Sequence, residues 1–178
     1  MITKILVAAD GSDCSCRAVE MAADLAAKYG AELTVLHVLM HGEPPAELQK
    51  MALVEHLVDE TPPETPTPGV AGTPLGGVGR TDFSHVEHQR ISFEIISALG
   101  QRVAANAVAA ARDKGADNVT SRIREGDTAD QILSACQDDG ADLVVLGSRG
   151  LGTLGGLLLG SISQKVSQLA ACPCLIVR

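Results

Sequence analysis

Residues 143–166 read LVVLGSRGLGTLGGLLLGSISQKV, an apolar run followed by glycines and a polar helix start. The apolar run ends at Gly147, and Gly150 and Gly160 follow before Ser161 opens a helical pattern. Glycine lets backbone N–H groups approach an anion because no Cβ intervenes. The positive end of the following helix also favours negative charge. The order strand, glycine-rich loop and helix N-terminus therefore predicts a phosphate site.

The spacing of the glycines separates this loop from the common phosphate-binding motifs. Two residues lie between Gly147 and Gly150, and nine lie between Gly150 and Gly160, which Ser161 follows directly. The P-loop pattern GxxxxGK[ST] occurs nowhere in the chain, and the dinucleotide pattern GxGxxG belongs after the first strand. A merely flexible loop is the alternative interpretation, and the flanking strand and helix favour the phosphate site.

The composition predicts one domain with an aliphatic core. Of the 178 residues, 46% are hydrophobic but only 2% are aromatic, which suits parallel strands covered by helices. The formal net charge of −8 argues against nucleic acids and anionic membrane surfaces as partners. We find no apolar run of the ~18 residues that cross a membrane, and no signal peptide pattern. We therefore expect a cytoplasmic protein.

Five cysteines form two Cys-x-Cys pairs, Cys14 with Cys16 and Cys172 with Cys174, and leave Cys136 single. We expect reduced thiols, as in most cytoplasmic proteins. The two pairs offer the four thiolates of a zinc site. However, Cys14 follows the first predicted strand and Cys172 precedes the last, so they belong to opposite edges of a parallel sheet, about 17 Å apart. We therefore predict structural thiols.

Strand and helix patterns alternate along the chain. Strands are predicted at 4–9, 32–39, 118–124, 141–146 and 174–178. Helices are predicted after the first strand as far as Tyr29, from near residue 83 or 91 to Lys114, from 128 to near 140, and from 161 to the Cys172-Pro173 step. Ser12 or Ser15 is expected to cap the first helix. Capping boxes are expected at Thr128 with Gln131 and at Ser161 with Gln164.

Residues 41–90 interrupt this alternation. A short helix is predicted from Pro44 to Val58, and an acidic stretch rich in Pro and Gly follows at about 59–83. Seven of the eight prolines lie between Pro44 and Pro74. This composition predicts a surface excursion from a single domain that spans residues 1–178. A protein partner could bind through residues 59–90.

The glycine motif resembles the nucleotide-binding signature of the universal stress protein family, Gly-x2-Gly-x9-Gly-Ser/Thr, and fills every fixed position. The opening ILVAADGS, the strand ELTVLHV and the closing CPCLIVR are also similar to the family, so only the Pro/Gly-rich stretch does not match. The resemblance implies an α/β fold, an open, doubly wound five-stranded parallel sheet in the order 3-2-1-4-5 with helices on both faces (adenine nucleotide alpha hydrolase-like). Ligands bind at the carboxyl ends of such strands, where neighbouring connections diverge.

The resemblance also implies which residues bind a nucleotide. Asp10 is expected near the ribose and any Mg²⁺, with a role as a carboxylate at the helix start as the alternative, and no other metal site is expected. The backbone of Val38 is expected to contact adenine, with Ala9 and Leu146 beside the same pocket, whereas His37 is predicted to be a core histidine. The remaining expected contacts come from the motif: Gly147, Arg149, Gly150, Gly160, Ser161 and Ile162.

The segment between Gly150 and Gly160, LGTLGGLLL, departs from the family because it carries no Lys or Arg. A triphosphate would meet positive charge only from Arg149, the helix end and a metal ion. The loop could therefore favour AMP or ADP over ATP, or bind weakly.

We predict a stress-response regulatory protein that binds ATP, ADP or AMP and acts as a homodimer. The resemblance implies that the strand at 174–178 pairs antiparallel with its copy across a two-fold axis. No catalytic constellation is evident, so at most slow ATP hydrolysis is expected. Two other functions stay open: an ATP-using pyrophosphatase or ligase of related fold, and an interaction module that binds no nucleotide.

Overall fold

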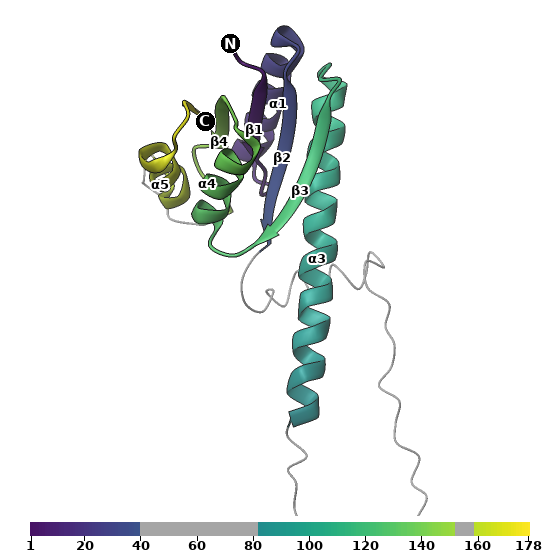
Figure 1. The fold of residues 1–178 in the computed structure, drawn as a ribbon. Coiled ribbons are helices and arrows are strands. Elements are labelled where there is room, and N and C mark those ends of the chain that lie inside the picture. The colour runs from purple at the N-terminus through teal and green to yellow at the C-terminus, as the bar shows by residue number, and fades with distance from the viewer. Residues whose placement is uncertain (40–81, 152–158) are drawn as a thin grey trace, which may run out of the picture. The chain divides into compact units, whose positions relative to one another are not determined.

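A computed structural model describes residues 1–39, 82–151 and 159–178 of the chain (Figure 1). The chain divides into two compact units, Met1–His41 with Gly100–Arg178, and Gly42–Leu99. The described part of the second unit is helical and forms the first part of helix α3 (Asp82–Asp113). The short helix expected from Pro44 and nearly all of the Pro/Gly-rich excursion lie outside the described residues, so both stay predictions.

Five parallel strands form one sheet in the first unit. They are β1 (Lys4–Ala8), β2 (Glu32–Leu39), β3 (Val119–Glu125), β4 (Leu143–Gly147) and β5 (Cys174–Val177). Their order is β3-β2-β1-β4-β5, and every neighbouring pair is parallel. The expected fold class and strand order are confirmed. β3 is an edge strand whose side chains are mostly exposed, as its polar alternation predicted.

Helices cover both faces of this sheet (Figure 1). On one face, Ile5 and Val7 of β1 pack with the alanine-rich sides of α1 (Asp13–Tyr29) and of residues 100–113 of α3. On the other face, Leu6 packs with residues of α4 (Thr128–Asp139) and α5 (Ser161–Leu169). Burial on both faces explains why β1 and β4 read as continuous aliphatic runs. No helix in the described parts of the chain is long and apolar enough to cross a membrane.

The helix starts of α4 and α5 differ from the predicted capping boxes, which are wrong in both cases. Asp127 is the N-cap of α4, and its carboxylate accepts a hydrogen bond from the N–H of Asp130 at 3.1 Å. Gly160 is the N-cap of α5, with no side-chain capping bond. Thr128 and Ser161 are therefore the first residues inside their helices. Asp, Gly, Ser and Thr all suit the N-cap position. When an Asp or Gly directly precedes a Ser or Thr, either residue can therefore be the N-cap.

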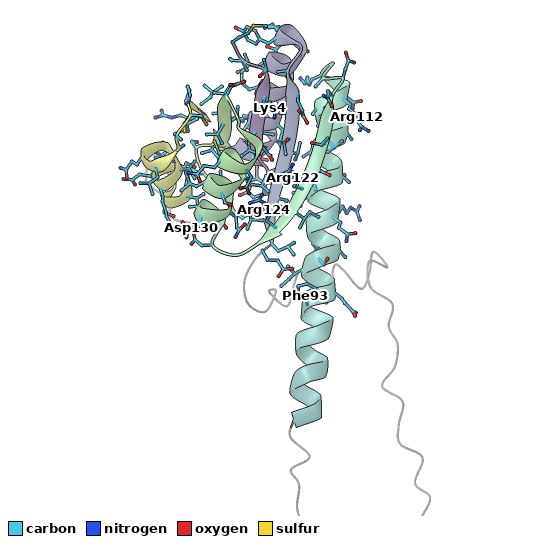
Figure 2. All side chains as sticks on the ribbon, in the orientation of Figure 1. Lys4, Phe93, Arg112, Arg122, Arg124 and Asp130 are labelled. Carbon is cyan, nitrogen blue, oxygen red and sulfur yellow. The ribbon has the colours of Figure 1, made fainter. Side chains whose placement is uncertain are left out.

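Two arginines of β3 join the sheet to α4. Arg122 Nη1 lies 2.5 Å from Asp139 Oδ1, and Arg124 Nη2 lies 2.8 Å from Asp138 Oδ2. Figure 2 labels both arginines, which stand two residues apart on β3 and so share one face of the strand. These pairs hold α4 toward the β3 edge of the sheet.

The carboxylate of Asp142 ties the start of β4 to the start of β1. Its Oδ2 accepts hydrogen bonds from the N–H of Thr3 at 2.7 Å, the hydroxyl of Thr3 at 2.7 Å and the N–H of Lys4 at 3.1 Å. These donors, those of Thr3 first, hold the pKa of Asp142 below its ordinary value. A lowered pKa in the folded state stabilises the protein above the unfolded-state pKa of about 3.9. That contribution is lost as the pH falls through the lowered, folded-state pKa.

We expect Asp142→Ala to lower the melting temperature at neutral pH, because three hydrogen bonds to a charged acceptor are lost. The difference from the wild type should narrow as the pH falls below about 3.9, where the wild-type carboxylate also loses its charge. Thermal unfolding followed by circular dichroism across this pH range measures the difference. Asp24→Ala, which removes a half-exposed carboxylate paired with Lys28, is the control and should have little effect. A difference that does not change with pH would contradict the assignment.

Candidate functional site

The carboxyl ends of β1 and β4 lie side by side, since these strands pair directly. The helices that follow them, α1 and α5, cover opposite faces of the sheet. Such a point of divergence is where open α/β sheets bind ligands. The loops at 9–12 and 147–160 therefore form the candidate site, although residues 152–158 of the second loop lie outside the described residues.

The carboxylate of Asp10 connects these two loops. Its Oδ1 accepts hydrogen bonds from the N–H and the hydroxyl of Ser12, at 2.9 and 2.6 Å. Its Oδ2 accepts a hydrogen bond from the N–H of Leu151 at 3.2 Å. Gly11 has a φ of 83°, a conformation that lets the chain turn back between Asp10 and Ser12. Asp10 thus organises the start of α1 and also contacts the glycine motif.

Gly150 lies where the second loop passes Asp10. A Cβ at Gly150 would overlap Oδ2 of Asp10. Its φ lies outside the left-handed range, so this position needs glycine for space rather than for its backbone conformation. The hydroxyl of Ser12, 3.3 Å from the carbonyl oxygen of Arg149, adds a second contact between the loops.

Gly147 permits a close contact between β4 and α1. A Cβ at this position would lie 2.8 Å from the carbonyl carbon of Cys14 and 2.9 Å from the nitrogen of Ser15. Both atoms belong to the backbone of α1, so neither can move aside as the tip of a side chain can. The first glycine of the motif is therefore required by the packing of the fold, before any ligand is considered.

Gly160 begins α5 and is tied to the end of β4. Its N–H donates to the carbonyl oxygen of Ser148 at 2.8 Å, and the hydroxyl of Ser163 donates to the carbonyl oxygen of Gly147 at 2.7 Å. Among the described residues, none accepts a hydrogen bond from the N–H of Ser161 or Ile162. The first N–H groups of a helix have no partner within the helix, so this end of α5 can bind an anion.

Arg149 supplies positive charge between the two outer glycines of the motif. Its side chain is exposed, and within the described residues its guanidinium forms no ion pair. Asp10 supplies a carboxylate to this loop, through its bond to Leu151. Among the residues that the structure describes, the site therefore combines a guanidinium without an ion-pair partner, a carboxylate and a helix N-terminus.

The residues expected around adenine lie at three adjacent strand ends. Ala9 and Leu146 are buried and Val38 is half-buried. Nδ1 of His37 lies 2.7 Å from the carbonyl oxygen of Ala9, which can only accept, so Nδ1 carries the proton. His37 is only 8% exposed and is the core histidine that the sequence predicted.

Gly100 of α3 was not recognised from the sequence, although it shapes this end of β2. A Cβ at Gly100 would overlap Cδ2 of Leu39 and lie 3.0 Å from Cδ2 of His37. Glycine inside a helix lowers helix stability by about 1 kcal/mol relative to alanine. The close approach of α3 to β2 explains why glycine is present at this position. The need for glycine at position 100 is visible only from its closeness to β2, which lies about sixty residues earlier in the chain. The alanine-rich sequence around Gly100 does not indicate it.

The structure brings most of the predicted site residues together. Asp10, Gly147, Arg149, Gly150 and Gly160 meet through the contacts between the two loops. Ser161 and Ile162 are exposed in the first turn of α5. Ala9, Val38 and Leu146 lie at adjoining strand ends, and Leu146 directly precedes Gly147 of the motif.

Comparison with known protein families gives one match over the whole chain. The model of the Universal stress protein family matches residues 1–178. Universal stress protein YxiE of Bacillus subtilis is 34% identical over 180 residues and covers 100% of both chains. A universal stress protein of Thermus aquaticus is 32% identical over 178 residues, again with 100% of both chains covered.

Solved structures share the same fold. The universal stress protein UspA from Lactobacillus plantarum has a TM-score of 0.68 at 20% identity, over 99% of this chain and 98% of that one. A universal stress protein in complex with cAMP has a TM-score of 0.59 at 22% identity, over 99% and 97% of the two chains. The universal stress protein from Archaeoglobus fulgidus in complex with dAMP has a TM-score of 0.56 at 19% identity, over 100% of both chains.

We expect Gly147→Ala to lower the free energy of unfolding by about 1–3 kcal/mol, the usual range for an overpacked contact. The added methyl group would press on the backbone of Cys14 and Ser15. Denaturant unfolding measures the loss. Ser167→Ala, at an exposed position of α5, is the control and should change stability little. If Gly147→Ala were as stable as the wild type, the contact between β4 and α1 would be looser than the structure shows.

Proposed function

Because the chain belongs to the universal stress protein family, we propose that it binds an adenine nucleotide at the carboxyl ends of β1 and β4. Its role would be regulatory, in the stress response, rather than that of a dedicated enzyme. The observation that carries this proposal is the start of α5, where the N–H groups of Ser161 and Ile162 bond to none of the described residues. The two family structures in complex with cAMP and dAMP support the choice of ligand class.

The phosphate would lie at the N-terminus of α5. The unbonded N–H groups and the positive end of the helix favour an anion, and Gly160 adds no side chain in front of them. Ser161 can add its hydroxyl, which is exposed in the first turn. Arg149 has a guanidinium without an ion-pair partner among the described residues, and phosphate is a good acceptor for it.

The carboxylate of Asp10 would bind the ribose or a Mg²⁺ ion. Its Oδ2 accepts one hydrogen bond in the described residues, from Leu151, and so retains a lone pair. Carboxylate oxygens are hard ligands that suit Mg²⁺, which is usually held by one or two of them together with phosphate oxygens. The residues present therefore fit the ion, whose charge would offset the repulsion between Asp10 and a polyphosphate. A nucleotide with one phosphate needs this compensation less, so we propose that AMP and ADP bind at least as well as ATP.

Adenine would lie against the ends of β1, β2 and β4. Ala9 and Leu146 present buried aliphatic surface there, and Val38 is the half-buried residue next to the last residue of β2. His37 holds the carbonyl group of Ala9 in place and so fixes the end of β1. Apolar surface of this kind, with few polar groups, is typical of sites for planar ligands.

We expect Gly160→Val to weaken nucleotide binding by at least about tenfold, or ~1.4 kcal/mol. A branched side chain would stand at the helix start, only 3.3 Å from the carbonyl oxygen of Ser148 at its Cβ. Calorimetric titration of ATP, ADP and AMP, each with and without Mg²⁺, measures the affinity.

The matched control is Ser167→Val, which places the same side chain on an exposed turn of α5 away from its start. It should bind as the wild type does. If Gly160→Val kept its affinity and its circular dichroism spectrum, the phosphate would not lie at α5. Mass spectrometry of small molecules released from the denatured wild type tests the alternative that the protein is an interaction module without a nucleotide. A pyrophosphate release assay tests the alternative that it is an ATP-using pyrophosphatase or ligase.

We also propose a homodimer through β5, the edge strand beside β4. Val144 donates to the carbonyl oxygen of Pro173, and Ser148 donates to that of Val177. Backbone groups alternate in direction along a strand, so residues 173, 175 and 177 face β4. The N–H and C=O groups of Ile176 therefore face outward, where a second β5 can pair with them. An unpaired apolar edge strand favours such pairing.

We expect Ile176→Pro to convert a dimer into a monomer, because proline removes an outward N–H donor without removing a bond to β4. Light scattering during size exclusion measures the mass. Ile176→Ala keeps the donor and should stay dimeric, whereas Val177→Pro removes a bond within the sheet and should unfold the protein instead. A wild type that is monomeric at micromolar concentration would contradict the proposal.

A further inference from the structure

Two cysteines from distant parts of the sequence meet between α4 and the connection from α5 to β5. Sγ of Cys136, in the last turn of α4, lies 2.8 Å from Sγ of Cys172, two residues before β5. All five cysteines are free thiols in this structure. A disulfide bond is about 2.05 Å long, so the two sulfur atoms need to approach by only about 0.8 Å.

The two thiols differ in exposure. Cys172 is half-buried, whereas Cys136 is only 4% exposed. Burial first, and then the hydrogen bond with Cys172, raise the pKa of Cys136 to about 12. Oxidants attack thiolates that they can reach. Cys172 is therefore the thiol that meets an oxidant, and Cys136 is the second thiol placed beside it.

We propose that Cys136 and Cys172 form a redox-sensitive dithiol, which a hydroperoxide converts into an intramolecular disulfide. The sulfur of Cys172 attacks a peroxide oxygen, the O–O bond breaks, and the leaving oxygen takes up the thiol proton as water or an alcohol. The sulfur of Cys136 then attacks the sulfenic sulfur of Cys172. The S–O bond breaks, and the hydroxide leaves with the proton of Cys136 as water. Two electrons pass from the two thiols to the peroxide, and a dithiol reductant reverses the change.

The disulfide would close a loop around the candidate site. Residues 137–171 contain β4, the glycine motif and α5. A covalent link between the ends of this segment restricts the unfolded chain, so the oxidised protein should melt about 5–10 °C higher. The dithiol lies at the amino ends of β4 and β5, whereas the candidate site lies at the carboxyl ends of β1 and β4.

The three other cysteines provide internal controls. Sγ of Cys174 lies 3.6 Å from the carbonyl oxygen of Cys172 and 3.9 Å from that of Val166, so it contacts backbone oxygens rather than a thiol. Cys14 and Cys16 are in the first turn of α1, where Sγ of Cys14 lies 3.7 Å from the hydroxyl of Ser148.

Trypsin divides the five cysteines among three peptides. Residues 125–149 contain Cys136 alone, residues 166–178 contain Cys172 and Cys174, and residues 5–17 contain the other two. The full chain is treated with one equivalent of hydrogen peroxide, its free thiols are alkylated, and it is digested without reductant. We expect one linked species of 125–149 and 166–178 that carries a single alkyl group, on Cys174, and is otherwise two hydrogen masses lighter than the two peptides together. Dithiothreitol should remove it and lower the melting temperature again.

Variants assign the link to one pair. Cys174→Ser should retain both the linked species and the rise in melting temperature, as should the exposed control Cys16→Ser. Cys172→Ser and Cys136→Ala should lose both, with circular dichroism spectra like that of the wild type under reducing conditions. Sulfinic acid at Cys172 beside a fully alkylated Cys136 would overturn the proposal. A link that persists in Cys172→Ser, or one that joins two chains, would overturn it as well.

Discussion

The hydrogen bonds of the Asp10 carboxylate are the constraint on which the candidate site depends. One oxygen atom is held by Ser12 in its own loop, and the other accepts the N–H of Leu151 from the loop after β4. Gly150 leaves just enough room for that second oxygen atom. The two loops therefore position each other, and they connect the Asp10 carboxylate to the N-terminus of α5. The arrangement of the candidate site follows from this one contact between the two loops.

Much of the fold could be predicted from the sequence, because burial on both faces of a parallel sheet leaves a strong pattern. The strand at Glu32–Leu39 was predicted with its observed bounds, while β4 begins two residues later than expected. The order of the strands came from the family resemblance. The helix starts were predicted less well, since the cap depends on which residue takes the extended conformation. Asp127 and Gly160 take it one residue before the expected Thr and Ser.

The sequence predicted which residues lie at the candidate site better than it predicted why glycine stands at particular positions there. The sequence marked Gly147 and Gly150 as glycines that admit phosphate, and the structure gives both a packing role, against α1 and against Asp10. Such roles depend on distances between loops more than 130 residues apart, which local spacing does not contain. The same holds for the contact between Cys136 and Cys172. Cys136 has no cysteine near it in sequence, and its partner is found only when α4 and β5 are placed on the sheet.

The bond from Leu151 to Asp10 uses the backbone of Leu151 and not its side chain, which is 62% exposed. Every amino acid except proline supplies the same N–H group at this position. The contact between the two loops can thus survive almost any exchange of the residue that donates it, while the acceptor at position 10 and the glycine at position 150 are narrowly restricted. The side chain at the rim of the candidate site can therefore change during evolution without loosening the contact between the two loops.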